Sequence, residues 1–437
     1  MAAFIPAELP PSRRKHVAVI GAGFVGLASA LWLQARGHQV TLVDRQPPLG
    51  NAGWRQAASY GNACTVAPQA VLPVATPGLV WQVPAMIADQ TGPLSIRWRY
   101  LPHLLPWLLA FLRAGRKAEV DRIIAVLASL LGQAEAGWTP LFDMANARHL
   151  LRRNGCLYLY KSQAEFDAAD AWHRRREQHG VNLTRLDAGA VREMEPNLAP
   201  LYHRGVLFDD AFTIDSPRQL ADRLARRIVE NGGTFLAGEA TGVGGDGSRV
   251  AFSVDGAGHR ADHLVVASGA HSARLARQLG DRILLDTERG YHVLFPEAGR
   301  LLTRPVCFAE EGFYMTPMAD GLRAAGTVEL GGLEAPPNPR RADVIAKGVE
   351  RFVPRAGRAG ETWMGFRPSM PDSLPVIGNS PTLPNVTYAF GHGHIGLTLA
   401  GVTGRLVSEL VCGEPPHIDV APLRCDRFSR WGWKRQA

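Results

Sequence analysis

Cysteine is scarce in this sequence, and no cysteine pair has the spacing of a metal-binding or redox motif. The 437 residues include five cysteines, none of them in a C-x-x-C pair: Cys64, Cys156, Cys307, Cys412 and Cys425. An odd, scattered set argues against a disulfide framework and against a structural zinc site, so no metal is expected. Isolated cysteines are usually buried apolar residues, and this pattern fits a reducing compartment.

A long uninterrupted apolar segment and a targeting segment are also lacking. Residues 17–33 carry no charge and follow Arg13-Arg14-Lys15, which superficially resembles a twin-arginine signal. Glycines at 21, 23 and 26 interrupt this run, and no small-residue cleavage pattern follows it. We therefore interpret the run as part of the fold, and a cytoplasmic location is expected.

Low-complexity tracts, internal repeats and long basic runs are absent as well. The length suits two or three domains, and 46% hydrophobic with 20% charged residues is typical of a globular protein. The net charge of +8 is spread along the chain, and its densest runs are short and not interleaved with aromatic residues. Nucleic-acid binding is therefore not expected, whereas diffuse positive charge attracts anionic cofactors and carboxylate substrates.

What the sequence does contain, near its N-terminus, is a dinucleotide-binding pattern. Residues 16–20 and 39–43 predict buried strands, and residues 27–36 have the apolar spacing of a helix. Gly21-Ala-Gly23-Phe-Val-Gly26 joins the first strand to the helix, and Asp44 ends the second strand. The glycines permit a tight turn, close approach to a pyrophosphate and helix–strand packing, while the helix N-terminus stabilises the phosphates. Asp44 is expected to accept hydrogen bonds from the adenosine ribose, which disfavours NADP.

Three distant segments favour FAD over NAD as the dinucleotide. Residues 262–272 predict a strand running into a small-residue turn, and residues 58–64 form a compact segment that can lie against a flat ring. Near the C-terminus, residues 385–390 predict a strand, residues 391–396 a Gly-rich turn and residues 397–410 a helix. The N-terminus of this second helix would stabilise negative charge on a reduced flavin. A nicotinamide-dependent dehydrogenase has no need for such a return and is the minor alternative.

These pieces, in this order, resemble the D-amino-acid oxidase/glycine oxidase (DAO) superfamily, and within it the bacterial D-amino-acid dehydrogenase branch. The matching segments run from residue 16 to about 412: GAGFVG with Asp44, SYGNA, VVASGAHS, Arg289-Gly-Tyr-His292, Phe313-Tyr-Met-Thr-Pro-Met318, Gly365-Phe-Arg-Pro368, Pro371-Asp-Ser-Leu-Pro-Val-Ile-Gly378 and GHGHIGLTLAG. The resemblance implies an α/β, two-domain fold, with a doubly wound FAD-binding domain and an α+β substrate domain that carries a large antiparallel sheet. Both domains are expected to be discontinuous: residues 1–92, 205–278 and 362–437 bind FAD, and residues 93–204 and 279–361 form the substrate domain.

The resemblance also assigns residues to the cofactor and to the substrate. The residues expected to bind FAD are Gly21, Gly23, Phe24, Val25, Gly26, Asp44, Arg45, Ser59, Asn62, Ala63, Val243, Gly269, Gly393, His394, Ile395, Gly396 and Thr398. Arg367 lies in the segment that reaches the pocket in this family, and a guanidinium binds a carboxylate bidentately. Tyr314 lies where family members supply a tyrosine hydroxyl to the substrate, and Tyr291 and His292 lie in another predicted pocket strand. For each of these four residues the competing interpretation is an ordinary surface or core position.

Together these observations predict an FAD-dependent dehydrogenase of a D-amino acid. In this hypothesis Arg367 binds the substrate carboxylate, hydride passes from Cα to flavin N5, and an imino acid results. A cyclic substrate such as D-proline or 4-hydroxy-D-proline suits the superfamily. The alternatives are a glycine or sarcosine oxidase that uses O₂, and a non-catalytic FAD-binding subunit of a larger complex. The expected electron acceptor is a quinone or another electron carrier.

Residues 94–131 combine many large apolar side chains with arginines and lysine. The segment is too interrupted to span a bilayer. Two interpretations stay open: it is a helical part of the substrate domain packed on its sheet, or it contacts the inner face of the cytoplasmic membrane, where a dehydrogenase passes electrons to quinone.

Overall fold

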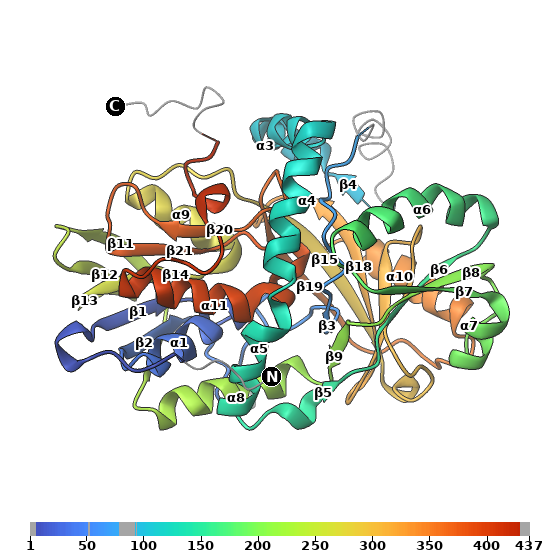
Figure 1. Cartoon of the computed structure of the whole chain (residues 1–437), viewed down its shortest axis with the longest axis horizontal. Helices are drawn as coiled ribbons and strands as arrows, with labels where there is room; N and C mark the ends of the chain where they lie inside the picture. Colours follow the sequence, from blue (N-terminus) through green and yellow to red (C-terminus); the bar gives the residue numbers. More distant parts are fainter. Residues whose placement is uncertain (1–5, 51–52, 78–91, 93, 429–437) are drawn as a thin grey trace.

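The computed structural model describes residues 6–50, 53–77, 92 and 94–428, which form four β-sheets flanked by helices (Figure 1). A six-stranded sheet occupies the left half of Figure 1. In spatial order it contains β10 (Thr234–Ala237), β2 (Gln39–Asp44), β1 (His16–Ile20), β14 (His263–Val266), β21 (Val386–Phe390) and β20 (Val376–Asn379). The strands from β10 to β21 run parallel, and β20 is antiparallel to β21. Segments predicted from both ends of the chain thus share one sheet.

Alternate residues of β1 face two different layers, as the period of two in a strand requires. Val17 and Val19 pack with helices α1 (Phe24–Ala35), α5 (Ala134–Met144), α8 (Pro217–Glu230) and α11 (Gly396–Cys412). Ala18 and Ile20 pack with α9 (Ser272–Gln278) and with a three-stranded sheet of β11 (Ala240–Gly245), β12 (Val250–Val254) and β13 (Ala257–Ala261). The parallel sheet is therefore covered on both faces.

A nine-stranded sheet forms the right half of Figure 1. In order it contains β19 (Thr362–Ser369), β15 (Asp286–Phe295), β18 (Gly321–Leu330), β17 (Phe313–Met318), β16 (Val306–Phe308), β6 (Cys156–Tyr160), β8 (Arg204–Phe208) and β7 (Leu183–Asp187), with β4 (Leu94–Ile96) paired to β18. Helix α10 (Pro339–Phe352) packs on one face through Ile345, Val349 and Phe352. The opposite face is left for the site described below.

Shorter elements connect the two halves. Helices α3 (Leu101–Ala114) and α4 (Lys117–Leu131) share one hydrophobic cluster with α11, and α4 and α5 run across the front of the molecule in Figure 1. The other elements are β3 (Thr65–Val66), β5 (Leu151–Arg152) and β9 (Phe212–Ile214) of a small sheet, helices α6 (Gln163–Gln178) and α7 (Ala188–Met194), and the 3₁₀ turns η3 (Trp98–Tyr100), η5 (Gly269–His271) and η7 (Gly393–Ile395).

The strands place two of the expected domain boundaries differently. The boundary expected between residues 204 and 205 falls inside β8, and β8 lies wholly in the nine-stranded sheet, where it pairs with β6 and β7. The boundary expected at residue 361 precedes β19, which also belongs to that sheet because it pairs with β15 along its whole length. Pro368 is tolerated in β19 because β19 is an edge strand of the sheet.

Among the described residues, Gly393–Cys412 is the one helical segment long and apolar enough to cross a membrane. Of its most apolar stretch of 18 residues, 78% is buried inside the protein, as expected for a core helix that packs on α1 and α5.

Helices α5 and α11 cross with their backbones in contact at a pair of glycines. A Cβ on Gly137 would lie 2.3 Å from the backbone nitrogen of Val402, and one on Gly401 would lie 2.5 Å from the carbonyl carbon of Gly137. We expect Gly137→Ala to force the helices apart and to lower the free energy of unfolding by about 1–3 kcal/mol. Chemical denaturation measures this, with Gly258→Ala as the control because a Cβ there meets open space. Equal stabilities of the two variants would contradict the packing argument.

Candidate active site

A cavity of about 490 Å³ extends between the six-stranded and nine-stranded sheets. Its walls come from segments that are far apart in the chain. Most of the residues predicted from sequence line it: Gly21, Gly23, Phe24, Val25, Asp44, Arg45, Ser59, Asn62, Ala63, Gly269, Tyr314, Arg367, Gly393, His394, Ile395, Gly396 and Thr398. The fold therefore brings the predicted cofactor and substrate residues to one space.

One end of the cavity lies where β1 turns into α1. Gly21 has φ +107°, and a Cβ there would lie 2.4 Å from the carbonyl oxygen of Ala267. A Cβ on Gly26 would lie 1.8 Å from the carbonyl oxygen of Gly21, so Gly26 permits the helix to pack on the turn but does not line the cavity. Asp44 accepts hydrogen bonds from the backbone N–H groups of Ala22 (2.7 Å) and Gln46 (2.8 Å). These contacts hold the carboxylate beside the turn.

The segment at residues 59–63 forms the next part of the wall and is held from both sides. The Ser59 hydroxyl accepts the N–H of Phe24 (3.2 Å), which ties the segment to the start of α1. From the nine-stranded sheet, the Arg323 guanidinium donates to the carbonyl of Tyr60 (2.9 Å), and the Thr316 hydroxyl donates to that of Ala63 (2.8 Å). Small side chains here leave the backbone close to the cavity, as contact with a flat ring requires.

Cys64 follows this segment but does not line the cavity. Its side chain is buried, and burial raises the pKa of its thiol to about 12. A thiol held protonated in this way is a poor nucleophile.

The N-terminus of α11 approaches the cavity at η7. Gly393, His394, Ile395 and Gly396 contribute to the wall, and the Thr398 hydroxyl accepts the N–H of Ala67 (3.0 Å). The preceding His392 is buried, and its Nε2 bonds to the Thr403 hydroxyl (2.9 Å). Burial lowers the pKa of His392 to about 3, so its imidazole is neutral.

These features fit an FAD. Two helix N-termini, those of α1 and α11, supply positive dipole ends to one elongated cavity, where a pyrophosphate and a flavin pyrimidine ring need them. At Gly21 a Cβ would clash with backbone, so the close approach of the chain that a dinucleotide needs is built into the turn.

Arg367 stands on the wall formed by the nine-stranded sheet. From β19 it extends over Gly290 of β15 to reach β18, where its guanidinium donates to the carbonyls of Thr327 (2.9 Å) and Gly326 (3.5 Å). A Cβ on Gly290 would lie 2.4 Å from the guanidinium carbon, so this path requires glycine. Within the part of the chain that the structure describes, Arg367 forms no ion pair with a carboxylate. Since a guanidinium has five N–H donors, Arg367 retains donors for a carboxylate.

The carbonyl that positions Arg367 belongs to an irregular part of β18. Thr327 has φ +55°, and the pairing of β15 with β18 shifts register beside it. Such a bulge changes the direction in which backbone groups point. A left-handed conformation is unfavourable for a β-branched residue, so it is found only where neighbouring residues stabilise it. Arg341 of α10 donates to the Thr327 hydroxyl (3.4 Å) and to the carbonyl of Val328 (2.9 Å) from the face away from the cavity.

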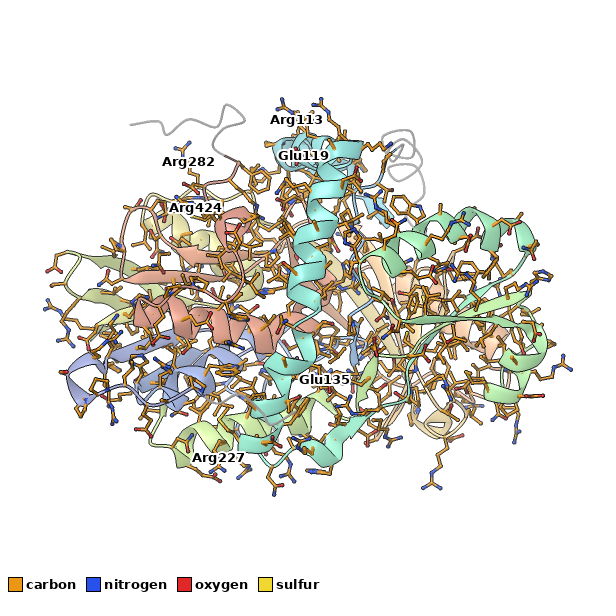
Figure 2. The ribbon with its side chains drawn as sticks, in the orientation of Figure 1. Arg113, Glu119, Glu135, Arg227, Arg282 and Arg424 are labelled. Carbon is orange, nitrogen blue, oxygen red and sulfur yellow. The ribbon has the colours of Figure 1, made fainter. Side chains whose placement is uncertain are left out.

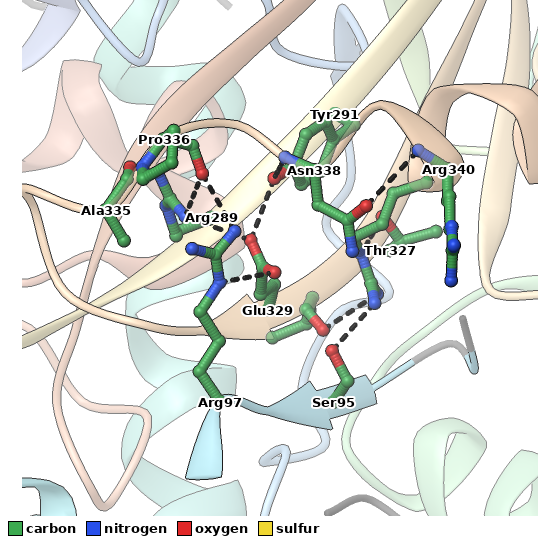
Figure 3. Close-up of polar contacts among 12 residues, drawn as sticks. Ser95, Arg97, Arg289, Tyr291, Thr327, Glu329, Ala335, Pro336, Asn338 and Arg340 are labelled. Carbon is green, nitrogen blue, oxygen red and sulfur yellow. Dashed lines mark hydrogen bonds and ion pairs between the residues drawn. The ribbon is translucent and has the colours of Figure 1, made fainter. Parts of the chain in front are cut away.

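A buried polar network on that same outer face is centred on Glu329 (Figure 3). Its carboxylate accepts hydrogen bonds from Arg97 (2.8 Å), Arg289 (3.1 Å) and the Tyr291 hydroxyl (2.8 Å). The Tyr291 hydroxyl in turn accepts the N–H of Asn338 (2.9 Å). The network therefore joins β15 and β18 to the start of α10, directly behind the bulge.

Tyr314 and Tyr158 meet further along the cavity wall. They lie on β17 and β6, in register with Cys307 between them, and their hydroxyls are hydrogen-bonded to each other. Burial raises the pKa of both hydroxyls, so both side chains are neutral. Arg176 of α6 lines the cavity nearby and donates through Nε to the carbonyl of Gln69 (3.2 Å).

Besides Gly26, three predicted site residues do not line the cavity. Tyr291 points to the outer face because it alternates with Gly290 along β15. His292 returns to the inner face but lies behind the wall, where it bonds to the carbonyl of Gly61 (3.2 Å) and stacks on Trp363. Val243 is buried in β11; the wall at that point is formed by residues 238–240, a few positions earlier in the chain.

Sequence reasoning missed several residues of the wall, namely Tyr158, Arg176, residues 238–240 and Glu288. Glu288 directly precedes the segment 289–292 that was singled out, and its alternation with Gly290 could have pointed to the inner face. No local signal marks Tyr158 or Arg176, because their place in the site depends on the order of strands in the large sheet.

Comparison with known proteins gives the chain a family. Residues 16–410 match the DAO family, described as FAD dependent oxidoreductase. The chain is 40% identical over 424 residues to a D-amino-acid oxidase of Bradyrhizobium diazoefficiens, covering 95% of this chain and 99% of that protein. It is 32% identical over 442 residues to a D-amino acid dehydrogenase of Paramagnetospirillum magneticum, covering 95% and 100%. Its fold is similar to that of glycine oxidase from Geobacillus kaustophilus, with a TM-score of 0.72 at 22% identity over 95% of this chain and 99% of that one. The cavity's two helix N-termini and glycine turn agree with this match, and the protein belongs to the DAO family of FAD-dependent oxidoreductases.

Proposed function

We propose that this protein oxidises the Cα–N bond of a D-amino acid to give an imino acid. The observation that carries the proposal is Arg367, a guanidinium on the cavity wall that is held by two backbone carbonyls and keeps donors for a substrate carboxylate. Support for D-amino acids comes from the relatives that are 40% and 32% identical, which are named D-amino-acid oxidase and D-amino acid dehydrogenase.

The residues of the chain mainly bind and orient the substrate in this proposal. Arg367 binds the α-carboxylate, and the Tyr314–Tyr158 hydroxyl pair donates to the substrate from the other end of the same sheet face. FAD held in this cavity would supply the acceptor for the hydride from Cα. The N-terminus of α11 would stabilise negative charge on a reduced flavin, and the walls of the cavity limit the access of water to the reacting atoms.

The electron acceptor distinguishes two versions of this function. A dehydrogenase passes electrons to a quinone or another carrier, whereas an oxidase reduces O₂ to peroxide. The relative with 40% identity is named an oxidase and the one with 32% a dehydrogenase, so each version has support from a named relative. Steady production of peroxide would favour the oxidase. Glycine or sarcosine as the best substrate would favour the glycine oxidase alternative.

The surface of α3 supports peripheral membrane contact, as a quinone-linked dehydrogenase requires. Trp98, Leu105 and Leu109 are 66%, 49% and 55% exposed and recur at helical spacing on the side opposite to the buried Leu104, Trp107, Leu108 and Phe111. Exposed Arg113 and Arg116 stand at the end of the same helix, where Figure 2 shows Arg113 near the top of the molecule. Apolar side chains flanked by arginines suit a surface of anionic lipid.

The first experiment is anaerobic mixing of the flavinated protein with D- and L-amino acids, including the proline and 4-hydroxyproline isomers, while flavin absorbance is followed. Bleaching by D-isomers is expected, and their rates rank the side chains.

In Arg367→Ala we expect substrate binding to weaken by about 2–5 kcal/mol, because a buried carboxylate loses its charged partner. Arg367→Lys keeps the charge but not the bidentate geometry, so its affinity for the substrate should lie between those of wild type and Arg367→Ala. An unchanged Kd in Arg367→Ala would remove this residue from the site.

Asp44→Ala tests the proposed ribose contact. The carboxylate holds two N–H groups of the turn and lines the cavity, so its loss should yield protein with a low FAD-to-protein ratio and a raised Kd for added FAD. Asp343→Ala, the same substitution on the exposed side of α10, is the control. Full FAD occupancy of Asp44→Ala after dialysis would contradict the assignment.

Co-sedimentation with phosphatidylglycerol vesicles tests the membrane contact. The protein should bind these vesicles and bind neutral phosphatidylcholine vesicles more weakly, since the arginines attract anionic lipid. The double variant Leu105→Glu/Leu109→Glu should weaken binding by about tenfold or more. Leu201→Glu, at an exposed leucine before β8, should not. Equal binding of all three proteins would place the contact elsewhere or remove it.

A further inference from the structure

Glu288 and Arg367 face each other on the cavity wall without forming an ion pair. They are directly paired residues on the adjacent strands β15 and β19, and both side chains line the cavity. Opposite charges at such positions ordinarily come together. Here the guanidinium instead crosses Gly290 and is bound by the carbonyls of β18.

Glu288 is correspondingly left with a neutral partner. Only 4% of the residue is exposed, and one carboxylate oxygen accepts a hydrogen bond from the Ser369 hydroxyl (2.6 Å). In the described part of the chain no cation lies within ion-pair distance of this carboxylate. Burying a carboxylate and a guanidinium side by side is costly unless charged partners compensate them. The wall therefore presents a separated negative and positive charge to the cavity.

An amino acid zwitterion has the complementary arrangement of charges. Its carboxylate and its ammonium are attached to the same carbon, so a ligand whose carboxylate binds Arg367 must place its ammonium within a few ångströms. We propose, on the basis of the proposed function, that Glu288 binds the substrate ammonium and takes its proton before Cα is oxidised. The N–H bond of the ammonium breaks as an O–H bond forms on Glu288, which leaves the neutral amine whose lone pair the oxidation requires. This step is a proton transfer, in which nothing is oxidised or reduced and no additional reactant is needed.

Other ionisable groups lie close to Glu288 and shape this proton transfer. His394 of η7 and Arg367 of β19 both interact electrostatically with it. Burial lowers the pKa of His394, so its imidazole is neutral beside Glu288. Asp286, two residues earlier on β15, is also close, and burial raises its pKa. Asp286 accepts the Tyr100 hydroxyl (3.0 Å), and His103 lies near it on α3.

The test compares wild type, Glu288→Gln and the control Glu297→Gln, which removes an exposed carboxylate beyond the end of β15. Two ligands are used: the D-amino acid that bleaches wild type fastest, and the carboxylic acid with the same side chain and no amine, such as propanoate for D-alanine. In Glu288→Gln, kcat/KM for the amino acid at neutral pH should fall by about 10²-fold or more. The loss should shrink by about tenfold per pH unit as the pH rises, because the free amine then becomes available without the base. The Kd of the amine-free acid, measured by perturbation of flavin absorbance, should not increase.

Each other outcome is decisive. An unchanged pH profile in Glu288→Gln, or an equal loss of affinity for the amine-free acid, would overturn the proposal, since the latter means that Glu288 only holds Arg367. A loss of kcat/KM confined to substrates with a cationic side chain would also overturn the proposal, because Glu288 would then bind the substrate side chain and not its ammonium. If the variant does not fold, wild type still decides: kcat/KM that falls tenfold per unit of pH from the amine pKa downward shows that no base acts. If no D-amino acid reduces the wild-type flavin, the proposed function fails and this inference with it.

Discussion

The site depends on the way one buried guanidinium is satisfied. Arg367 could pair with Glu288 across the strand, but it reaches two backbone carbonyls on β18 instead. This arrangement requires Gly290 on β15 beneath the Arg367 side chain, and a bulge at Thr327 that turns its carbonyl toward the guanidinium. Because a positive φ in a β-branched residue is unfavourable by itself, the bulge needs support from behind. Arg341 and the network around Glu329 supply that support and explain why so many charges are buried on the outer face of these strands.

The cofactor half follows a different constraint, which is close approach of backbone. Glycines at the start of α1 and at the crossing of α5 with α11 allow helices to lie where any side chain would collide. The result is that two helix N-termini from opposite ends of the chain point into one cavity. Since the six-stranded sheet is assembled from distant segments, FAD that binds across them also stabilises the folded chain.

The two halves divide the work between cofactor and substrate. The tyrosines and histidines of the wall are neutral, because burial keeps the tyrosine hydroxyls protonated and the imidazoles uncharged. Two charged groups on the wall, Arg367 and Glu288, remain available to an amino acid because the hydrogen-bond partners of each are neutral. Under the proposed function, these two charges match those of a small zwitterion.

The sequence alone determined the dinucleotide turn, the cofactor and the family, because each is marked by short motifs that can be recognised without knowing the fold, and it made Arg367 a candidate through the same resemblance. Glycine spacing after a β-branched run and an acid ending the next strand are local features, so their meaning does not depend on the rest of the fold. Only the tertiary structure decided that Tyr291 faces away from the cavity, that His292 lies behind its wall, and that Glu288, Tyr158 and Arg176 belong to it. A strand directs alternate side chains to opposite faces, and which face meets the cavity depends on pairings between segments distant in the chain, such as Glu288 with Arg367 and Tyr158 with Cys307.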